Sequence, residues 1–375
     1  MAAFSFLLSC LPCSPRPRRT FVVNGREFEA SGELLGEGSY GLVHKVNECD
    51  VAPARVYALK ELRVPLADAM REVNAHLAVG TSQPHVLPLL AHSVAELGSA
   101  PAAAAAASPP PRRGGGAVAS EDRDDRPCVA LLLFPLAERG TLAGAIAGAL
   151  AARAGGGGGG GAHLHVGRAL SEAEALALCS GIARGLLALH SAGLAHRDVN
   201  PRNALLPSGS GGAVLCDLGS AAPLLLPLSS RAACRRAVEE AAARTSPAYR
   251  APELWACDPG APQDGSAADV WALGCVIFAC AWGASPFELA PAGGAGGPLR
   301  LVEPCHSRTL GALAFPPQPR HVSEPFERLV ADCLQHAPAQ RPTVGEVLER
   351  VDARLRALRA ERSGAAGGGK EDGPI

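Results

Sequence analysis

Alternating apolar and polar residues follow a glycine-rich run near the amino terminus. The glycines are Gly36, Gly38 and Gly41, and residues 42–46 after them alternate as in a strand with one buried face. In dinucleotide-binding folds a helix follows this glycine spacing, whereas here a strand does. The pattern therefore predicts a hairpin between two strands, whose glycines let backbone amides approach a ligand closely.

Further strands are predicted by shorter apolar runs. Residues 20–23 form the first predicted strand, residues 57–60 form a run that ends in Lys60, and residues 131–134 have the continuous apolar character of a buried strand. Residues 213–216 predict a short strand that leads into Asp217. These runs and the glycine hairpin indicate a small sheet in the amino-terminal part of the chain.

Helical periodicity dominates the carboxy-terminal part. Residues 171–192 begin with Ser171 and Glu174, the signature of a capping box, and continue with apolar residues at helical spacing. Residues 229–244 are rich in alanine, arginine and glutamate and contain no glycine or proline, which predicts a second helix.

Low-complexity stretches divide the chain. Residues 99–126 pass from an alanine run through prolines and glycines to a charge cluster, and residues 153–167 contain seven successive glycines. Neither composition can form a packed core, so we interpret both as insertions. The predicted organisation is an amino-terminal segment at 1–19, one folded domain at 20–358 and a disordered tail at 359–375.

Composition limits the class of protein. The chain has 375 residues and a net charge of -1, which argues against nucleic acid as a principal partner. Its twelve cysteines are scattered, and several, such as Cys216, Cys275 and Cys280, lie in apolar surroundings as reduced buried thiols do. A cytoplasmic protein is the simplest interpretation.

Residues 196–203 provide the strongest chemical signal. They run His-Arg-Asp-Val-Asn-Pro-Arg-Asn, with the carboxylate of Asp198 five residues before the amide of Asn203. Asp217, followed by Leu218 and Gly219, comes fourteen residues after Asn203. Phosphoryl transfer needs such a set, with one carboxylate to accept a proton and two oxygen ligands for magnesium.

The amino-terminal motifs would complete such a site. Lys60 lies about twenty residues after the hairpin, and Glu72 is the best candidate for a carboxylate that holds it in place. Glu72 lies in a predicted helix with Met70, Val73 and Leu77 along one apolar face. Taken singly, a lysine or a glutamate is usually a solvated surface charge, so the order of the motifs is what supports the interpretation.

Together these motifs resemble the eukaryotic protein kinases over residues 20–358. The resemblance is closest to the numb-associated group and its myristoylated and palmitoylated serine/threonine kinase branch. The stretches that narrow it to this group are residues 131–133, 139–142, 217–220, 246–254 and 317–321.

The resemblance implies an α+β fold with two lobes. A small antiparallel sheet lobe with one helix, at about 20–134, precedes a larger, mainly helical lobe at about 138–358. It also implies that Glu253, in the Ala251-Pro252-Glu253 motif, is buried against Arg341. Asp269 is expected to support the backbone of the catalytic loop, and residues 229–244 to form an extra helix in the activation segment.

The resemblance also implies the function of each site residue. The protein is expected to transfer the γ-phosphate of ATP to serine or threonine hydroxyls of protein substrates, with Mg²⁺, or alternatively Mn²⁺, as the metal. Asp198 is the expected base and Asn203 and Asp217 the metal ligands; Lys60, Glu72, Arg202 and Thr245 are the other catalytic candidates. The residues expected to hold the nucleotide are Gly36, Glu37, Gly38, Ser39, Tyr40, Gly41, Val43, Ala58, Lys60, Phe134 and Ala137.

One position departs from the family. Asn200 stands where serine/threonine kinases usually have a lysine that touches the transferred phosphate. Arg202 lies four residues after Asp198, where tyrosine kinases have an arginine, and we hypothesise that it replaces the missing charge. The alternative is a weakly active or inactive pseudokinase that acts as a scaffold, and the oligomeric state is left open.

The amino terminus bears on localisation. Members of the kinase branch that this chain resembles have a lipidated glycine at position two. This chain has Ala2, so myristoylation is not expected. Cys10 and Cys13, next to apolar and basic residues, are candidate palmitoylation sites. A short targeting peptide is the competing interpretation. Attachment to the Golgi or another endomembrane is expected from the resemblance alone.

Overall fold

The computed structural model describes residues 19–38, 41–97, 126–154, 168–209, 212–260, 262–291, 299–316 and 321–367. Several predictions fall outside these residues. They concern Cys10 and Cys13, Ser39 and Tyr40, most of the insertions at 99–126 and 153–167, residues 317–320, and the end of the tail at 368–375. The described residues form two compact units, one within 1–66 and 90–136 and the other within 67–89 and 137–375, and each is described by itself.

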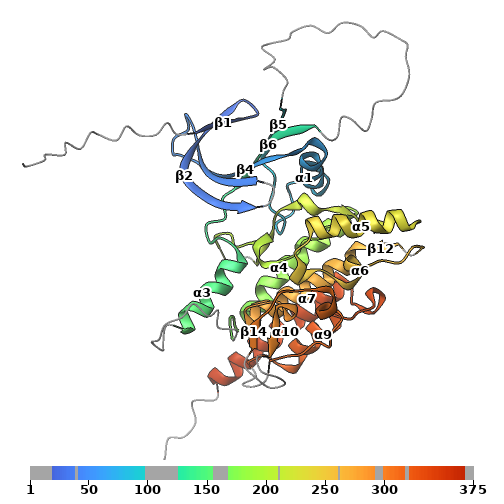
Figure 1. The fold of residues 1–375 in the computed structure, drawn as a ribbon. Coiled ribbons are helices and arrows are strands. Elements are labelled where there is room, and N and C mark those ends of the chain that lie inside the picture. The colour runs from blue at the N-terminus through green and yellow to red at the C-terminus, as the bar shows by residue number, and fades with distance from the viewer. Residues whose placement is uncertain are drawn as a thin grey trace, which may run out of the picture. The chain divides into compact units, whose positions relative to one another are not determined.

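The first unit is a six-stranded antiparallel sheet, drawn in blue and cyan in Figure 1. Its strands, in spatial order, are β1 (Thr20–Val23), β2 (Arg26–Gly38), β3 (Gly41–Glu48), β4 (Val56–Pro65), β6 (Pro127–Pro135) and β5 (Ala91–Glu96). Apolar side chains of the sheet form its core, namely Phe21, Val23, Phe28, Ala30, Val46, Leu59, Ala91 and Leu133. The predicted strands are confirmed.

The glycine hairpin joins β2 and β3 as predicted, and Gly41 has a packing reason to be glycine. A Cβ atom at this position would lie 2.1 Å from the carbonyl oxygen of Glu61 on β4. The predicted end of the next strand is corrected, because β4 continues past Lys60 to Pro65. Its partner β6 is also longer than the predicted run, and the ladder between the two strands extends to Pro127.

The second unit is mainly helical. Its helices are α1 (Leu66–Val79), α3 (Leu142–Ala154), α4 (Glu172–Ser191), α5 (Arg231–Arg244), α6 (Pro252–Trp255), α7 (Gly265–Trp282), α8 (His306–Thr309), α9 (Glu324–Cys333) and α10 (Val344–Gly367). Short strand pairs β7 (Leu194–Ala195) with β10 (Ala222–Pro223), β8 (Ala204–Leu205) with β9 (Val214–Leu215), β11 (Leu225–Leu226) with β12 (Gln263–Asp264) and β13 (Leu289–Pro291) with β14 (Leu299–Leu301) lie between them. A sheet lobe and a larger helical lobe were predicted, and the fold class is confirmed.

The centre of the second unit is the apolar helix α7. By length and composition α4 and α7 could each cross a membrane, but 94% of α7 and 56% of α4 are buried inside the protein. Trp271 of α7 is fully buried and stacks on Phe287 with ring centroids 5.2 Å apart. Both helices therefore have the burial of core helices in a folded domain.

Side-chain caps begin two of the predicted helices, and the cap of the first was itself predicted. The hydroxyl of Ser171 accepts the N–H of Glu174, whose carboxylate accepts the N–H of Ser171, so the capping box at the start of α4 is present. Helix α5 begins after Ser230, whose hydroxyl accepts the N–H of Ala233. The predicted tail is corrected, because α10 continues through residues 359–367.

Helix α1 belongs with the second unit, although residues up to 134 were predicted to form the first lobe. Its Ala75 and Val79 join the core of the helical unit, which explains this grouping. The buried face of α1 contains positions 69, 72, 73, 75, 76 and 79. Leu77, predicted to share one apolar face with Met70 and Val73, lies beyond the edge of the buried face and is 61% exposed.

Candidate active site

The predicted nucleotide-binding residues of the first unit share one face of its sheet. In the ladders, Val43 is opposite Lys60 and Ala58 is opposite Phe134. Directly opposed residues point to the same face, and so do residues two apart along a strand, such as Ala58 and Lys60. The opposite face contains Leu59 and the apolar core. The sheet thus brings these four predicted residues together.

Phe134 and Ala137, two of the residues predicted to hold the nucleotide, fall in different units. Phe134 is buried near the end of β6, and Ala137 is the first residue of the second unit after the sheet. The carbonyl of Ala137 accepts the N–H of Gly140 at 3.2 Å, so it already takes part in a turn. Its role in holding the nucleotide stays a prediction.

A buried carboxylate supports the backbone of the predicted catalytic loop just before Asp198. Asp269 on α7 is fully buried and accepts the backbone N–H groups of His196 and Arg197, both at 2.8 Å. It also accepts a hydrogen bond from Nε2 of His190 on α4 at 2.9 Å. This confirms the predicted support by Asp269, while His190 was not foreseen.

Arg197 is held in an unusual position beside this carboxylate. Its φ of 67° lies in the left-handed region, and its side chain is buried and donates to Oε1 of Gln263 at 3.1 Å. Burial lowers the pKa of the guanidinium, whereas the carboxylates of Glu240 and Asp269 act in the opposite direction. The loop backbone is therefore fixed immediately before the candidate base.

The carboxylate of Asp198 has two donors. Its Oδ1 accepts the N–H of Ser246 at 2.8 Å, and its Oδ2 accepts Nδ2 of Asn203 at 2.8 Å. The same Nδ2 also donates to the carbonyl of Asp198 at 2.9 Å. Both amide hydrogens of Asn203 are thus directed at Asp198. This leaves Oδ1 of Asn203 as the oxygen for a metal ion.

The second predicted metal ligand is brought beside the first by a hairpin. Ala204 of β8 is opposite Leu215 of β9, and Cys216 N–H donates to the carbonyl of Asn203 at 3.0 Å. Asp217 comes next, with a φ of 62° in the left-handed region. One carboxylate and one amide oxygen fit Mg²⁺, which prefers hard oxygen ligands and shares its sphere with phosphates and water.

His196 connects Asp198 to the end of this hairpin at Cys216. Its Nδ1 accepts the N–H of Asp198 at 3.3 Å, so its Nε2 carries the proton and donates to the carbonyl of Cys216 at 3.1 Å. The ring thereby links the candidate base to the strand that ends at Asp217.

The buried carboxylate of Glu72 lies close to the turn after Asp217. Glu72 is 2% exposed, and a Cβ atom on Gly219 would be 3.2 Å from Oδ1 of Asp217 and 3.4 Å from Oε2 of Glu72. Helix α1 therefore packs against the segment that holds a predicted metal ligand.

Ion pairs also connect α1 to the activation-segment helix α5. Arg244 of α5 pairs with Asp68 at 2.5 Å, and Arg71 pairs with Glu240 at 3.5 Å. The hydroxyl of Ser220 donates to the carbonyl of Arg244 at 2.7 Å. The predicted extra helix is present and is attached to both α1 and the turn after Asp217.

The family resemblance also places the catalytic candidate Thr245 in contact with Asp198, and this prediction is corrected. The Thr245 hydroxyl donates to the carbonyl of Ala241 at 2.8 Å and accepts Nε of Arg250 at 2.6 Å. The next residue, Ser246, makes the contact with Asp198 through its backbone. Two adjacent hydroxyl residues are equivalent in sequence, and a backbone N–H contact has no residue signature.

Arg202 and Asn200 have different environments. Arg202 is exposed and forms no ion pair within the described part of the chain. Its charge acts on Glu288, opposing the rise in that carboxyl's pKa that burial causes. Asn200 is 4% exposed and points into the loop.

Comparisons with known proteins agree with this geometry. A family model described as "Protein kinase domain" matches residues 158–351. Serine/threonine-protein kinase 16 of Rattus norvegicus is 28% identical over 340 residues, which is 90% of this chain and 93% of the rat protein, and its Homo sapiens counterpart has the same values. Actin-regulating kinase 1 of Saccharomyces cerevisiae is 30% identical over 184 residues, 48% of this chain and 26% of the yeast protein.

Proposed function

Because the chain belongs to the protein kinase family, we propose that it transfers the γ-phosphate of Mg-ATP to serine or threonine hydroxyls of protein substrates. One observation is the main support, namely the paired hydrogen bonds that fix the carboxylate of Asp198 between Ser246 and Asn203. A base must be held in a defined orientation to accept the proton of an attacking hydroxyl. Serine/threonine-protein kinase 16 of rat and human, named above, supports the same acceptor class.

The resemblance to the family implies a role for each site residue. Asp198 accepts the proton of the substrate hydroxyl, and Asn203 and Asp217 would hold Mg²⁺, which neutralises charge on the phosphates when it is bound. By the same resemblance, Lys60 is the proposed ligand of the α- and β-phosphates, and Glu72 is the proposed carboxylate that would hold it in position. Val43, Ala58 and Phe134, which share a sheet face with Lys60, enclose the adenine.

A direct assay tests this function. Purified protein is incubated with Mg-ATP and a generic protein substrate beside the Asp217→Ala variant, and phosphosites are located by mass spectrometry. We expect incorporation on serine or threonine by the wild type, and at least ~100-fold less by the variant, because it loses a metal ligand. Incorporation no greater than that of the variant would contradict the proposal and favour the scaffold alternative.

Arg202 is the proposed source of the charge that a lysine usually supplies. Its side chain is exposed and has no ion-pair partner within the described residues, so it is available to a phosphate. We expect Arg202→Ala to lower kcat by about 100-fold, corresponding to ~3 kcal/mol of transition-state stabilisation. Arg328→Ala, at an exposed arginine of α9, is the matched control and should leave kcat unchanged. An unchanged kcat for Arg202→Ala would exclude this role.

We further propose that the chain is a member of the numb-associated group. The helical activation segment supports this, since α5 follows the turn at Asp217 and is attached to α1 by two ion pairs. In this arrangement α5 shapes the surface beside Ser246 where a substrate would bind.

A further inference from the structure

The side chain of Asn200 makes four hydrogen bonds. A residue that merely stood in place of a phosphate-binding lysine would not need them. Its Oδ1 accepts the backbone N–H groups of Arg202 at 2.9 Å and Asn203 at 3.3 Å. Its Nδ2 donates to the carbonyl of Asp198 at 3.1 Å and to the hydroxyl of Ser246 at 3.2 Å. Two acceptor and two donor positions are what a side-chain amide offers, so the group is saturated.

The acceptor side of the amide shapes the loop. Asn200 is extended, with φ of −155° and ψ of 166°, and it caps a single 3-10 turn that begins at Pro201 and ends at Asn203. Proline at the first position of a turn has no N–H, and the cap accepts the next two, so every N–H of the turn is accounted for. The orientation of Asn203, a predicted metal ligand, therefore depends on Asn200.

The donor side joins the loop to the activation segment. Ser246 accepts from Nδ2 of Asn200 through its hydroxyl and donates its N–H to the carboxylate of Asp198. Asn203 closes the circuit, because its own Nδ2 bridges the carbonyl and carboxylate of Asp198. Asn200, Ser246 and Asn203 thus form a ring of hydrogen bonds that includes the candidate base Asp198.

We propose that Asn200 is a positioning residue for phosphoryl transfer, which acts by orienting Asn203 and Ser246 around Asp198. This inference rests on the proposed kinase function. It predicts that the lysine usual in the family would lower activity at position 200, rather than raise it. A lysine at position 200 has no acceptor, so it would leave the N–H of Arg202 unpaired, leave the N–H of Asn203 only its bond to the backbone carbonyl of residue 200, and place a charge where Asn200 is buried.

The test compares three variants of the full chain. Asn200→Lys introduces the family's usual cation, Asn200→Ser keeps a capping oxygen but cannot reach Ser246, and Ser246→Ala removes only the hydroxyl acceptor. Asn74→Lys, at an exposed asparagine of α1, is the control for adding a lysine. Steady-state kinetics gives kcat and KM for ATP, and amide hydrogen exchange without nucleotide reports the N–H groups of Arg202 and Asn203.

We expect Asn200→Lys to lower kcat at least tenfold and to speed exchange at Arg202 at least tenfold, with a smaller change at Asn203, whose N–H keeps its 3.1 Å bond to the backbone carbonyl of residue 200. Asn200→Ser and Ser246→Ala should lower kcat severalfold while exchange at these two amides stays near the wild-type rate. A kcat for Asn200→Lys equal to or above that of the wild type, or unchanged exchange, would overturn the inference.

Two other outcomes are also decisive. If Asn200→Lys does not fold, a kcat within twofold of the wild type for both Asn200→Ser and Ser246→Ala overturns the inference, and a severalfold loss supports it. If the wild type transfers no phosphate, the proposed kinase function fails, while the exchange rates still decide whether Asn200 orders the loop.

Discussion

Replacing Asp198 by asparagine is expected to lower kcat by ~10² to 10⁴-fold, which is the usual contribution of a general base. The substitution keeps the size and shape of the side chain but removes its ability to accept the substrate proton. The two donors that now bind the carboxylate, Ser246 N–H and Asn203 Nδ2, lie on its two separate oxygens. In the variant one of these oxygens becomes an NH₂ group that faces a donor, so a modest loss of local order accompanies the loss of the base.

The measurement separates chemistry from folding. We expect KM for ATP to change only severalfold and the melting temperature only by a few degrees, because Asp198 is half-buried and its backbone is held by Asn200 and Asn203. Asp352→Asn is the matched control, since its carboxylate pairs with Arg184 at 2.8 Å near the surface. That control should keep full activity. A kcat for Asp198→Asn within tenfold of the wild type would remove Asp198 from the role of base.

Local signals in the sequence explain which elements could be predicted. The capping box of Ser171 and Glu174 requires only neighbouring residues, and it locates the start of α4. Helix α5 follows from composition in the same way, and the hairpin follows from glycines and alternation. Each of these devices works within a few residues, so the sequence contains all that is needed.

Errors arose where an outcome depended on packing between distant residues. Leu77 has the right spacing for a buried position, but the stripe of α1 that packs ends beside it. Thr245 and Ser246 cannot be distinguished by residue type, and the contact with Asp198 is made by a backbone N–H. Asn200 looked like a lost charge because its partners become neighbours only in the folded loop.

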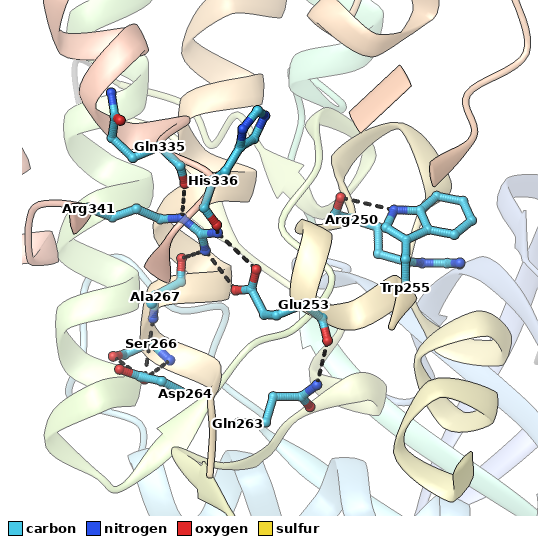
Figure 2. A network of polar contacts seen from close by, with 10 residues as sticks. All are labelled: Arg250, Glu253, Trp255, Gln263, Asp264, Ser266, Ala267, Gln335, His336 and Arg341. Carbon is cyan, nitrogen blue, oxygen red and sulfur yellow. Dashed lines mark hydrogen bonds and ion pairs between the residues drawn. The ribbon is translucent and has the colours of Figure 1, made fainter. Parts of the chain in front are cut away.

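The pair of Glu253 and Arg341 is a case in which order along the chain was sufficient. Two motifs 88 residues apart meet in a bidentate contact, with Nη1 to Oε1 at 2.7 Å and Nη2 to Oε2 at 2.8 Å, as Figure 2 shows. The predicted pair is confirmed. Arg341 also donates to the carbonyls of Gln335, His336 and Ala267.

These contacts are not divided equally between the two partners. The side chain of Arg341 is 0% exposed and that of Glu253 is 17% exposed. The guanidinium also lies 5.0 Å from the ring centroid of Trp271, where a cation and an aromatic face attract each other. Loss of Glu253 would leave Arg341 with three carbonyls and this ring, whereas loss of Arg341 would leave a carboxylate and three carbonyls without their donor.

We therefore expect Arg341→Met to destabilise the protein by ~3 to 5 kcal/mol and Glu253→Gln by clearly less, because breaking a buried pair is costly in proportion to what is left unpaired. For a unit of this size the first change should lower the melting temperature by about 10 °C in a thermal unfolding scan.

Arg350→Ala is the matched control for Arg341→Met. Its ion pair with Asp332 has the same 2.7 Å separation, but the two side chains are 50% and 40% exposed, so it should cost less than ~1 kcal/mol. Equal losses for Arg341→Met and Arg350→Ala would show that burial of the Glu253 pair does not determine its contribution. If Glu253→Gln cost as much as Arg341→Met, the ion pair itself, rather than the carbonyl contacts of Arg341, would hold these segments together.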